Sequence, residues 1–252
     1  MTNQGSFPTT DWGLFVNIRA GNSQAKRAAL DILIRRYWKP VFVFLRCQGK
    51  DEESAKDSTQ AFFADWIEHD VFAKADERKG RFRSFMLSCL KRFVANEHRA
   101  DRALKRRPTA GLLSLDELMD DTEHPYEPKD GLTPEMIFDR TWASEVVQRV
   151  LKHLELECRN TGKELHYDAF ARRIIKPILH GDPAPSLADL GREAGLTEKQ
   201  AANLLETAKR AYRRLMEEEI RLYAESEAEV EEEVRAIFRI LGGQSRISLK
   251  IV

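Results

Sequence analysis

Lysine and arginine side chains are grouped densely enough in this sequence to bind a polyanion, although the chain as a whole has no net charge. Between residues 78 and 107, eleven lysines and arginines stand against two acidic residues. Cations at this density can replace the counterions around nucleic-acid phosphates, and aromatic residues beside them can stack on an unpaired base. Two other segments, 116–135 and 217–233, are strongly acidic. The neutral total therefore conceals three strongly polarised segments.

Residue types suited to covalent or metal chemistry lack the spacing that such sites need. The six histidines are scattered without an HExxH pair, and the sequence contains no GxxxxGK[ST], GxGxxG or GxSxG motif. The three cysteines are far apart, with no CxxC pair. They are Cys47, Cys89 and Cys158. We therefore expect no enzyme activity, no metal site and no cofactor, and we expect reduced, mostly buried thiols.

The elements that carry these groups are all predicted to be helices, because apolar residues recur at three- and four-residue spacing throughout. In the first half, a helix begins near Ser23 with a kink or short break at Pro40, and a second begins at Asp51. A polar loop over 70–81 precedes a third helix from Phe82 to about residue 107.

The second half predicts a helix that opens at Pro134 with Thr133 as its cap, and another over about 167–179. Ser186 then caps a short helix, Gly195 supplies a turn, and Thr197 caps a longer helix. This order is typical of a helix-turn-helix, and the alternative is an ordinary helical hairpin. A final amphipathic helix has a narrow apolar stripe, and packing on the second domain is favoured over a regulatory lid or a partner-binding helix.

The predicted fold class is all-α, with two helical domains joined by an acidic linker, the second domain containing the helix-turn-helix. The expected boundaries are 10–107 for the first domain, 108–133 for the linker, 134–222 for the second domain, and 223–252 for the acidic C-terminal helix and tail.

Three groups of residues follow as candidates for binding. Arg83, Lys91 and Arg92 lie on the basic helix, where phosphate binding competes with the simpler interpretation of a solvated face. Asp57 and Gln60 share one exposed side of their helix, opposite a predicted core of Phe62, Phe63 and Trp66, and suit a protein-binding face. In the helix-turn-helix, the residues predicted near base edges are Lys199, Gln200 and Asn203, and those predicted near phosphates are Lys209, Arg210 and Arg213.

Four segments in order resemble the extracytoplasmic-function group of bacterial sigma factors, within the sigma-70 superfamily. They are RRYWKPVFVFLR (35–46), DSTQAFFADWI (57–67), KGRFRSFMLSCLKRFVANEHR (79–99) and LLSLDEL (112–118). The resemblance extends over about residues 10–241, and four motifs in register are far more specific than any one of them.

The resemblance implies a role in transcription initiation. The first domain would dock on core RNA polymerase through Asp57, Gln60 and Phe63, and would melt the promoter −10 element. The residues implied for the −10 region are Lys79, Arg81, Arg83, Lys91, Arg92, Asn96, His98 and Arg99. The acidic linker would thread toward the polymerase active centre, and the second domain would read the −35 element as duplex. Opening would be driven by binding energy, with no covalent step.

Two features depart from the family pattern. Ala202, Leu204, Glu206 and Thr207 stand where basic residues are common in the recognition helix, and Ala61 replaces an acid common in the docking motif. Polymerase docking and −10 engagement are therefore better supported than reading of the −35 element.

The expected function is that of a sigma factor with core RNA polymerase and promoter DNA as partners, and an anti-sigma factor or other signalling protein is left open. The alternative is a sigma-like adaptor that binds polymerase or a signalling partner without reading DNA sequence. No apolar run approaches the roughly 20 residues that cross a bilayer, so we expect a cytoplasmic protein without membrane insertion.

Overall fold

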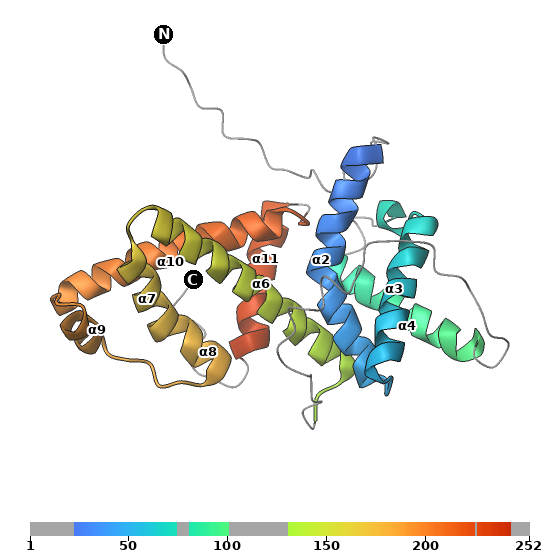
Figure 1. Ribbon diagram of the computed structural model, residues 1–252, viewed down its shortest axis with the longest axis horizontal. Coiled ribbons are helices and arrows are strands. Elements are labelled where there is room, and N and C mark those ends of the chain that lie inside the picture. The colour runs from blue at the N-terminus through green and yellow to red at the C-terminus, as the bar shows by residue number, and fades with distance from the viewer. Residues whose placement is uncertain (1–22, 75–80, 101–130, 225, 243–252) are drawn as a thin grey trace, which may run out of the picture. The chain divides into compact units, whose positions relative to one another are not determined.

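The computed structural model describes residues 23–74, 81–100, 131–224 and 226–242, and every regular element within these ranges is helical (Figure 1). The prediction of an all-α protein is therefore confirmed. The chain divides into two compact units. Unit 1 comprises residues 1–142 with 222–225, and unit 2 comprises residues 143–221 with 226–252.

Unit 1 is built on helical elements, most of which begin near the residues that the sequence predicts. They are α2 (Ser23–Cys47), α3 (Glu52–Glu68), the 3-10 turn η1 (Val71–Lys74), α4 (Phe82–Ala100) and the first nine residues of α6 (Pro134–Asn160). Asp51 caps α3, because its carboxylate accepts a hydrogen bond from the Ser54 backbone N–H at 2.8 Å. Residues 101–107, where the third helix was expected to continue, lie outside the described ranges.

Aromatic side chains fill the core of unit 1. Trp66 of α3 is 2 % exposed, and its ring centroid lies 4.7 Å from that of Phe72. The rings of Phe82 in α4 and Tyr37 in α2 lie edge to face, with their centroids 5.4 Å apart. The predicted burial of Trp66 is confirmed, and these rings fix the side of α4 that faces inward.

The sequence predicts a kink or a short break at Pro40, and helix α2 contains no break there, because buried residues on both sides of the proline, Tyr37 and Val41 among them, hold the helix against the core. One local prediction in unit 1 is wrong. The segment 70–81 is not entirely a polar loop, since η1 forms at its start and Phe72 is 1 % exposed. Burial of this one ring against Trp66 outweighs the polar character of its neighbours.

Helix α6 begins at Pro134, and the backbone N–H of Met136 donates to the Thr133 hydroxyl at 3.3 Å, which confirms the predicted start and cap. Its first nine residues pack within unit 1, and the remainder belongs to unit 2. Phe138 lies edge to face with Phe44 of α2 at 6.4 Å. The segment between α4 and α6 therefore leaves from unit 1 and returns to unit 1.

Unit 2 contains the rest of α6 and a continuous helical segment over residues 164–180. This segment consists of α7 (Glu164–Phe170), the π-helical turn η3 (Ala171–Ile175) and α8 (Lys176–His180). Three further helices follow, namely α9 (Leu187–Glu193), α10 (Glu198–Arg221) and α11 (Glu227–Gly242). The helix expected over about 167–179 thus begins three residues earlier, at Glu164.

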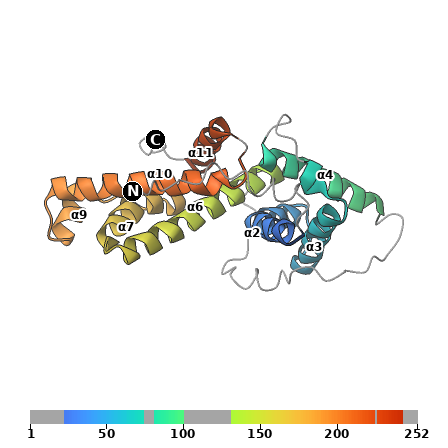
Figure 2. The same cartoon turned by 90° about the horizontal axis from the view of Figure 1, so that it is seen from above.

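Helix α10 is the central element of unit 2 and contacts α7, α9 and α11. It lies along α6 in Figures 1 and 2 and runs antiparallel to it, because Glu219 pairs with Arg149 at 2.9 Å while Arg214 pairs with Glu157 at 2.6 Å. Its inward side chains include Tyr212, which is fully buried 4.7 Å from the ring of Phe170. Helix α11 packs on α10 and α8, both of which belong to unit 2.

No helix in the described ranges combines the length and the apolar character needed to cross a membrane.

Candidate nucleic-acid interface

Helix α4 presents one buried and one exposed face because its apolar residues follow a four-residue spacing. Its inward side includes Met86 and Leu90, both fully buried. The outward side is a stripe of small, polar and basic residues, here named the α4 stripe: Ser84, Ser88, Lys91, Arg92, Ala95 and Asn96, all exposed. Small side chains beside the cations leave room for a nucleic-acid backbone to approach the helix closely.

Arg83 does not belong to this stripe. Its side chain is 7 % exposed, its guanidinium binds the Asp139 carboxylate of α6, and its central carbon lies 4.4 Å from the ring centroid of Trp142. A desolvated guanidinium stacked on an indole and held by a carboxylate is a packing element. Arg83 therefore offers no charge to a ligand in this structure.

Lys91 and Arg92 are both exposed, but their surroundings differ. The Lys91 ammonium lies 2.7 Å from the Glu135 carboxylate at the start of α6, and this hydrogen bond holds the pKa of Glu135 below its ordinary value. Arg92 donates to the Cys89 sulfur at 3.3 Å and forms no ion pair with any residue that the structure describes. Burial raises the pKa of the Cys89 thiol, with the neighbouring Arg92 only partly opposing the shift. Arg92 is thus the cation of the α4 stripe most available to a phosphate.

The remaining predicted residues of the −10 set are placed only in part. Asn96 is exposed, one helical turn from Arg92, and Arg81 is half-buried just before α4 begins. His98 and Arg99 lie in the last turn of α4, and their side chains fall outside the described part of the structure, as Lys79 does entirely.

Glu97 is an acidic residue of α4 and lowers the net positive charge of this helix. Its carboxylate accepts a hydrogen bond from the Ser58 hydroxyl of α3 at 2.9 Å and pairs with the Lys50 ammonium at 3.1 Å. It therefore joins α4 to α3 and to the turn before α3. The sequence shows Glu97 only as an exception within a basic run, and the run itself gives no sign of this role.

Helix α3 carries the predicted protein-binding residues on its outward side only in part. Asp57 is exposed and Gln60 is half-buried, with the exposed Ala61 beside them. Phe63 is 4 % exposed and its ring lies 5.4 Å from that of Phe62, so it belongs to the core. The outward face of α3 is consequently polar, and its two predicted binding residues supply one carboxylate and one amide.

In unit 2, the geometry of α9 and α10 follows from two caps and two glycines. The Ser186 hydroxyl accepts from the Asp189 N–H at 3.0 Å, which confirms the predicted cap of α9. Gly195 makes the turn with φ +68°, where a side chain would be strained. A Cβ on Gly191 would lie 2.8 Å from the Leu196 carbonyl oxygen, so α9 and the turn approach each other at backbone distance.

Helix α10 begins with a reciprocal cap, and the cap engages Gln200, one of the residues predicted to contact base edges. The Gln200 N–H donates to the Thr197 hydroxyl at 3.3 Å, and the Gln200 amide oxygen accepts from the Thr197 N–H and hydroxyl, each at 2.9 Å. Lys199 and Asn203 are exposed beside this cap. Of the three residues predicted near base edges, Gln200 is engaged in the cap, whereas the side chains of Lys199 and Asn203 take no part in these capping hydrogen bonds.

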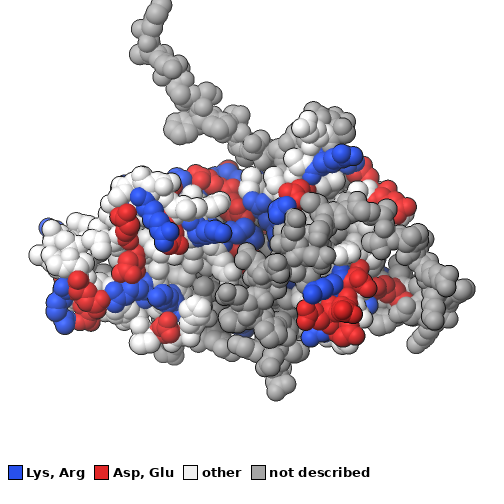
Figure 3. All heavy atoms as spheres, viewed as in Figure 1, with Lys and Arg blue, Asp and Glu red and all other residues white. Residues whose placement is uncertain are grey.

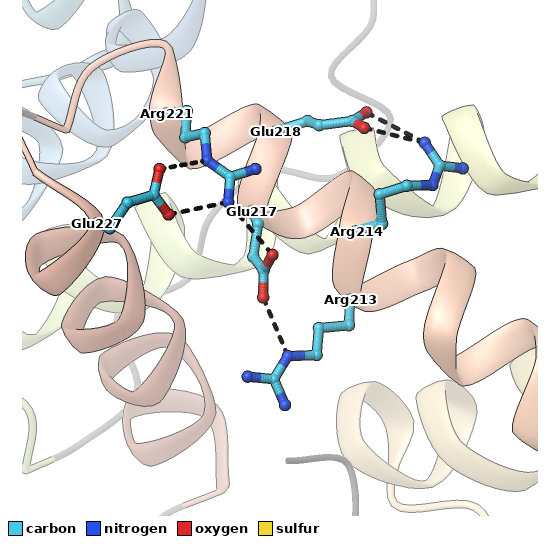
Figure 4. Close-up of polar contacts among 6 residues, drawn as sticks. All are labelled: Arg213, Arg214, Glu217, Glu218, Arg221 and Glu227. Carbon is cyan, nitrogen blue, oxygen red and sulfur yellow. Dashed lines mark hydrogen bonds and ion pairs between the residues drawn. The ribbon is translucent and has the colours of Figure 1, made fainter. Parts of the chain in front are cut away.

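Most cations further along α10 are paired with carboxylates (Figure 4). Lys209 pairs with Glu206 at 2.8 Å and Arg213 with Glu217 at 3.0 Å. Arg210 is exposed and forms no ion pair with a described residue. Lys199 and Arg210 are therefore exposed cations of α10 that form no ion pair with a residue that the structure describes.

The C-terminal part of α10 is tied to two other helices by arginines. Arg214 pairs with Glu157 of α6 at 2.6 Å and with Glu218 at 3.0 Å, and these carboxylates raise the pKa of Arg214. Arg221 holds both carboxylate oxygens of Glu227 at 2.8 and 2.9 Å, which joins α10 to α11 (Figure 4). The acidic residues of 217–233 thus serve in part as internal partners for α10.

Charges of both signs alternate over the face of the molecule drawn in Figure 3, where lysine and arginine side chains lie beside aspartate and glutamate. No group of histidine, cysteine, aspartate and glutamate side chains in the described ranges is placed to hold a metal ion. The described outward faces of α3 and α4 in unit 1, and of α9 and α10 in unit 2, carry mainly polar and charged side chains.

Comparison with known proteins adds no family assignment: no protein-family model matches this sequence, and no curated protein or solved structure shows a significant similarity to it.

Proposed function

We propose that this protein is a sigma factor, which binds core RNA polymerase and directs promoter recognition and opening. The observation that carries the proposal is the α4 stripe, an exposed line of small, polar and basic residues in the segment whose sequence resembles the −10 module of the extracytoplasmic-function group. Arg92 and Asn96 would contact the melted strand, and Lys91 would contribute when it is released from Glu135.

Two further features support the proposal. The outward face of α3, with Asp57 and Gln60, has the polar character expected of a surface that docks on polymerase. Helices α9 and α10 would act as the helix-turn-helix, with Lys199 and Asn203 toward base edges and Arg210 toward a phosphate. Binding energy alone would open the duplex, so we assign no covalent chemistry to this chain.

A second candidate is a sigma-like adaptor that binds polymerase or a signalling partner without reading DNA sequence. It is favoured by the ion pairs of α10, where Lys209 and Arg213 already have carboxylate partners and Glu206 stands on the outward face. A carboxylate at this position repels phosphate and weakens duplex binding.

Run-off transcription with purified core polymerase and a fragmented genomic library tests both candidates. The sigma proposal expects discrete new transcripts that share a pair of upstream elements. Stable polymerase binding without transcripts would favour the adaptor, and absence of both would reject the two candidates together.

Variants in the same assay separate docking from opening. Asp57→Lys with Gln60→Ala should abolish polymerase binding, whereas Asp182→Lys, an exposed charge reversal in the loop before α9, should not. Arg92→Glu should keep polymerase binding but lose permanganate reactivity of promoter thymines. The matched control is Arg27→Glu, an exposed charge reversal on α2. Normal thymine reactivity in Arg92→Glu would exclude a role of the α4 stripe in opening.

A further inference from the structure

Two charged contacts join the first turns of α6 to α4, and they differ sharply in burial. Arg83 is 7 % exposed and is enclosed by Asp139 and Trp142. Lys91 is 55 % exposed and Glu135, its partner at 2.7 Å, is 36 % exposed. Both carboxylates come from α6, one helical turn apart along the helix.

The difference in burial makes one contact permanent and the other exchangeable. If a desolvated guanidinium separated from its carboxylate, a buried charge would be left without a partner, at a large cost in free energy. A hydrated lysine–glutamate pair contributes little to stability, because water and salt compete for both partners. Arg83 with Asp139 and Trp142 therefore anchors α6 on unit 1, while Lys91 and Glu135 can separate without loss of the fold.

Lys91 belongs to the α4 stripe, where a bound nucleic acid would bring a second anionic acceptor to the same ammonium group. A phosphate oxygen offers Lys91 the same kind of charge-assisted hydrogen bond as the Glu135 carboxylate. The carboxylate and the phosphate would also repel each other, so both cannot hold Lys91 fully at once.

We propose that Glu135 is a competing carboxylate that occupies Lys91 until a nucleic-acid phosphate displaces it, while the Arg83 anchor keeps α6 in place. The inference rests on the proposed function only in taking the α4 stripe as a nucleic-acid surface. Its consequence is that the free chain binds single-stranded nucleic acid more weakly than its exposed cations would allow.

The experiment measures binding of a fluorescently labelled single-stranded oligothymidylate to the full chain by anisotropy, over a series of salt concentrations. Glu135→Gln should tighten binding about twofold to fivefold, the range expected from release of an exposed ion pair. The slope of log affinity against log salt should become steeper by about 0.7, because one more phosphate is neutralised on a single strand.

Two comparisons isolate the contact from the change in net charge. Glu155→Gln removes the same charge from the same helix, where the carboxylate pairs with Arg159 at 2.5 Å, and should leave the affinity and slope nearly unchanged. In a Lys91→Gln background, Glu135→Gln should have no effect on the slope.

Three results would overturn the inference. They are an equal effect of Glu135→Gln and Glu155→Gln, an effect of Glu135→Gln that persists without Lys91, and absence of oligothymidylate binding by all the variants at low salt. Failure of the proposed function is a separate result, since a chain that supports no transcription can still show the Glu135 effect. Transcription without that effect rejects this inference alone.

Discussion

Burial decides what each cation near α4 can do. Arg83, Lys91 and Arg92 have the same formal charge, but the first is enclosed, the second is paired at the surface and the third is exposed and donates to a sulfur. A cation that is nearly desolvated depends on its partner, whereas an exposed cation is free to exchange partners. Among these three residues, Arg83 therefore contributes to stability, and Lys91 and Arg92 can contribute to binding.

Substitution of Arg83 should destabilise the protein more than it weakens nucleic-acid binding. Arg83→Ala removes the partner of Asp139 and the cation over Trp142, and should lower the free energy of unfolding by about 2 to 3 kcal/mol, near the lower end for a buried pair because Asp139 remains partly hydrated. Arg83→Lys keeps the charge but loses the planar stacking, and should cost about 1 kcal/mol. Urea unfolding measures both values.

The matched control for this prediction is Arg92→Ala on the exposed side of the same helix. It should change the free energy of unfolding by less than about 0.5 kcal/mol, as expected for a surface position. Equal destabilisation by Arg83→Ala and Arg92→Ala would contradict the assignment of Arg83 to the packed interior.

At the scale of elements, α9 and α10 are held by short-range features and by two arginines of the π-helical turn η3. Arg173 donates a hydrogen bond to the Pro185 carbonyl just before α9. Arg172 forms an ion pair at 2.7 Å with Glu193, the last residue of α9. The two ends of α9 are thus tied to neighbouring residues of one turn. These two contacts position α9, and they thereby also place Gly191 of α9 close to the backbone of Leu196 in the following turn.

The two glycines of the α9–α10 connection should respond differently to alanine. In Gly191→Ala the new Cβ would lie 2.8 Å from the Leu196 carbonyl oxygen, so the backbone must move. We expect a loss of about 1 to 3 kcal/mol, the usual result of overpacking, and weaker duplex binding because α10 is displaced. Gly195→Ala has open space but φ +68°, so it should lose about 1 kcal/mol without displacing α10.

Urea unfolding and binding of promoter duplex by the polymerase complex measure the two effects separately. A Gly191→Ala protein with unchanged stability would mean that α9 and the turn can separate without penalty. A duplex affinity that falls equally in both variants would show that the left-handed turn, rather than the close approach, controls the position of α10.

At the scale of the whole molecule, balanced charge limits how strongly the protein can attract a polyanion. The chain has 41 basic and 41 acidic residues, and much of the acidic charge near α10 is used in internal pairs. The strength of the proposed duplex binding would therefore depend on which cations remain unpaired and not on the total number of lysines and arginines.

This charge distribution predicts unequal effects of two double substitutions on the salt dependence of duplex binding by the polymerase complex. Lys199→Gln with Arg210→Gln should make the slope of log affinity against log salt shallower by about 1.8, because two phosphate contacts are lost. Lys209→Gln with Arg213→Gln should change it much less, because Glu206 and Glu217 already neutralise these cations. Equal changes in slope would show that the α10 ion pairs open on binding.

The sequence alone determined the helices and most of their ends, because these depend on groups only a few residues apart. The caps at Asp51, Ser186 and Thr197 each satisfy a backbone N–H three residues away. The four-residue spacing of apolar side chains likewise specified the buried face of α4. Where the local prediction was wrong, at Phe72, burial in the core outweighed the polar character of the neighbouring residues.

Only the tertiary structure decided which charges of α4 are available, because the partners of Arg83 and Lys91 lie on α6, far away in the sequence. Arg83 meets Asp139 across 56 residues, and Arg214 meets Glu157 across 57. A run of cations specifies a charged segment, but each side chain's availability depends on the helix that packs beside it and on how far water is excluded. Folding therefore gives three residues of one predicted binding set different surroundings: Arg83 anchors α6, Lys91 is paired with Glu135, and Arg92 remains an exposed cation.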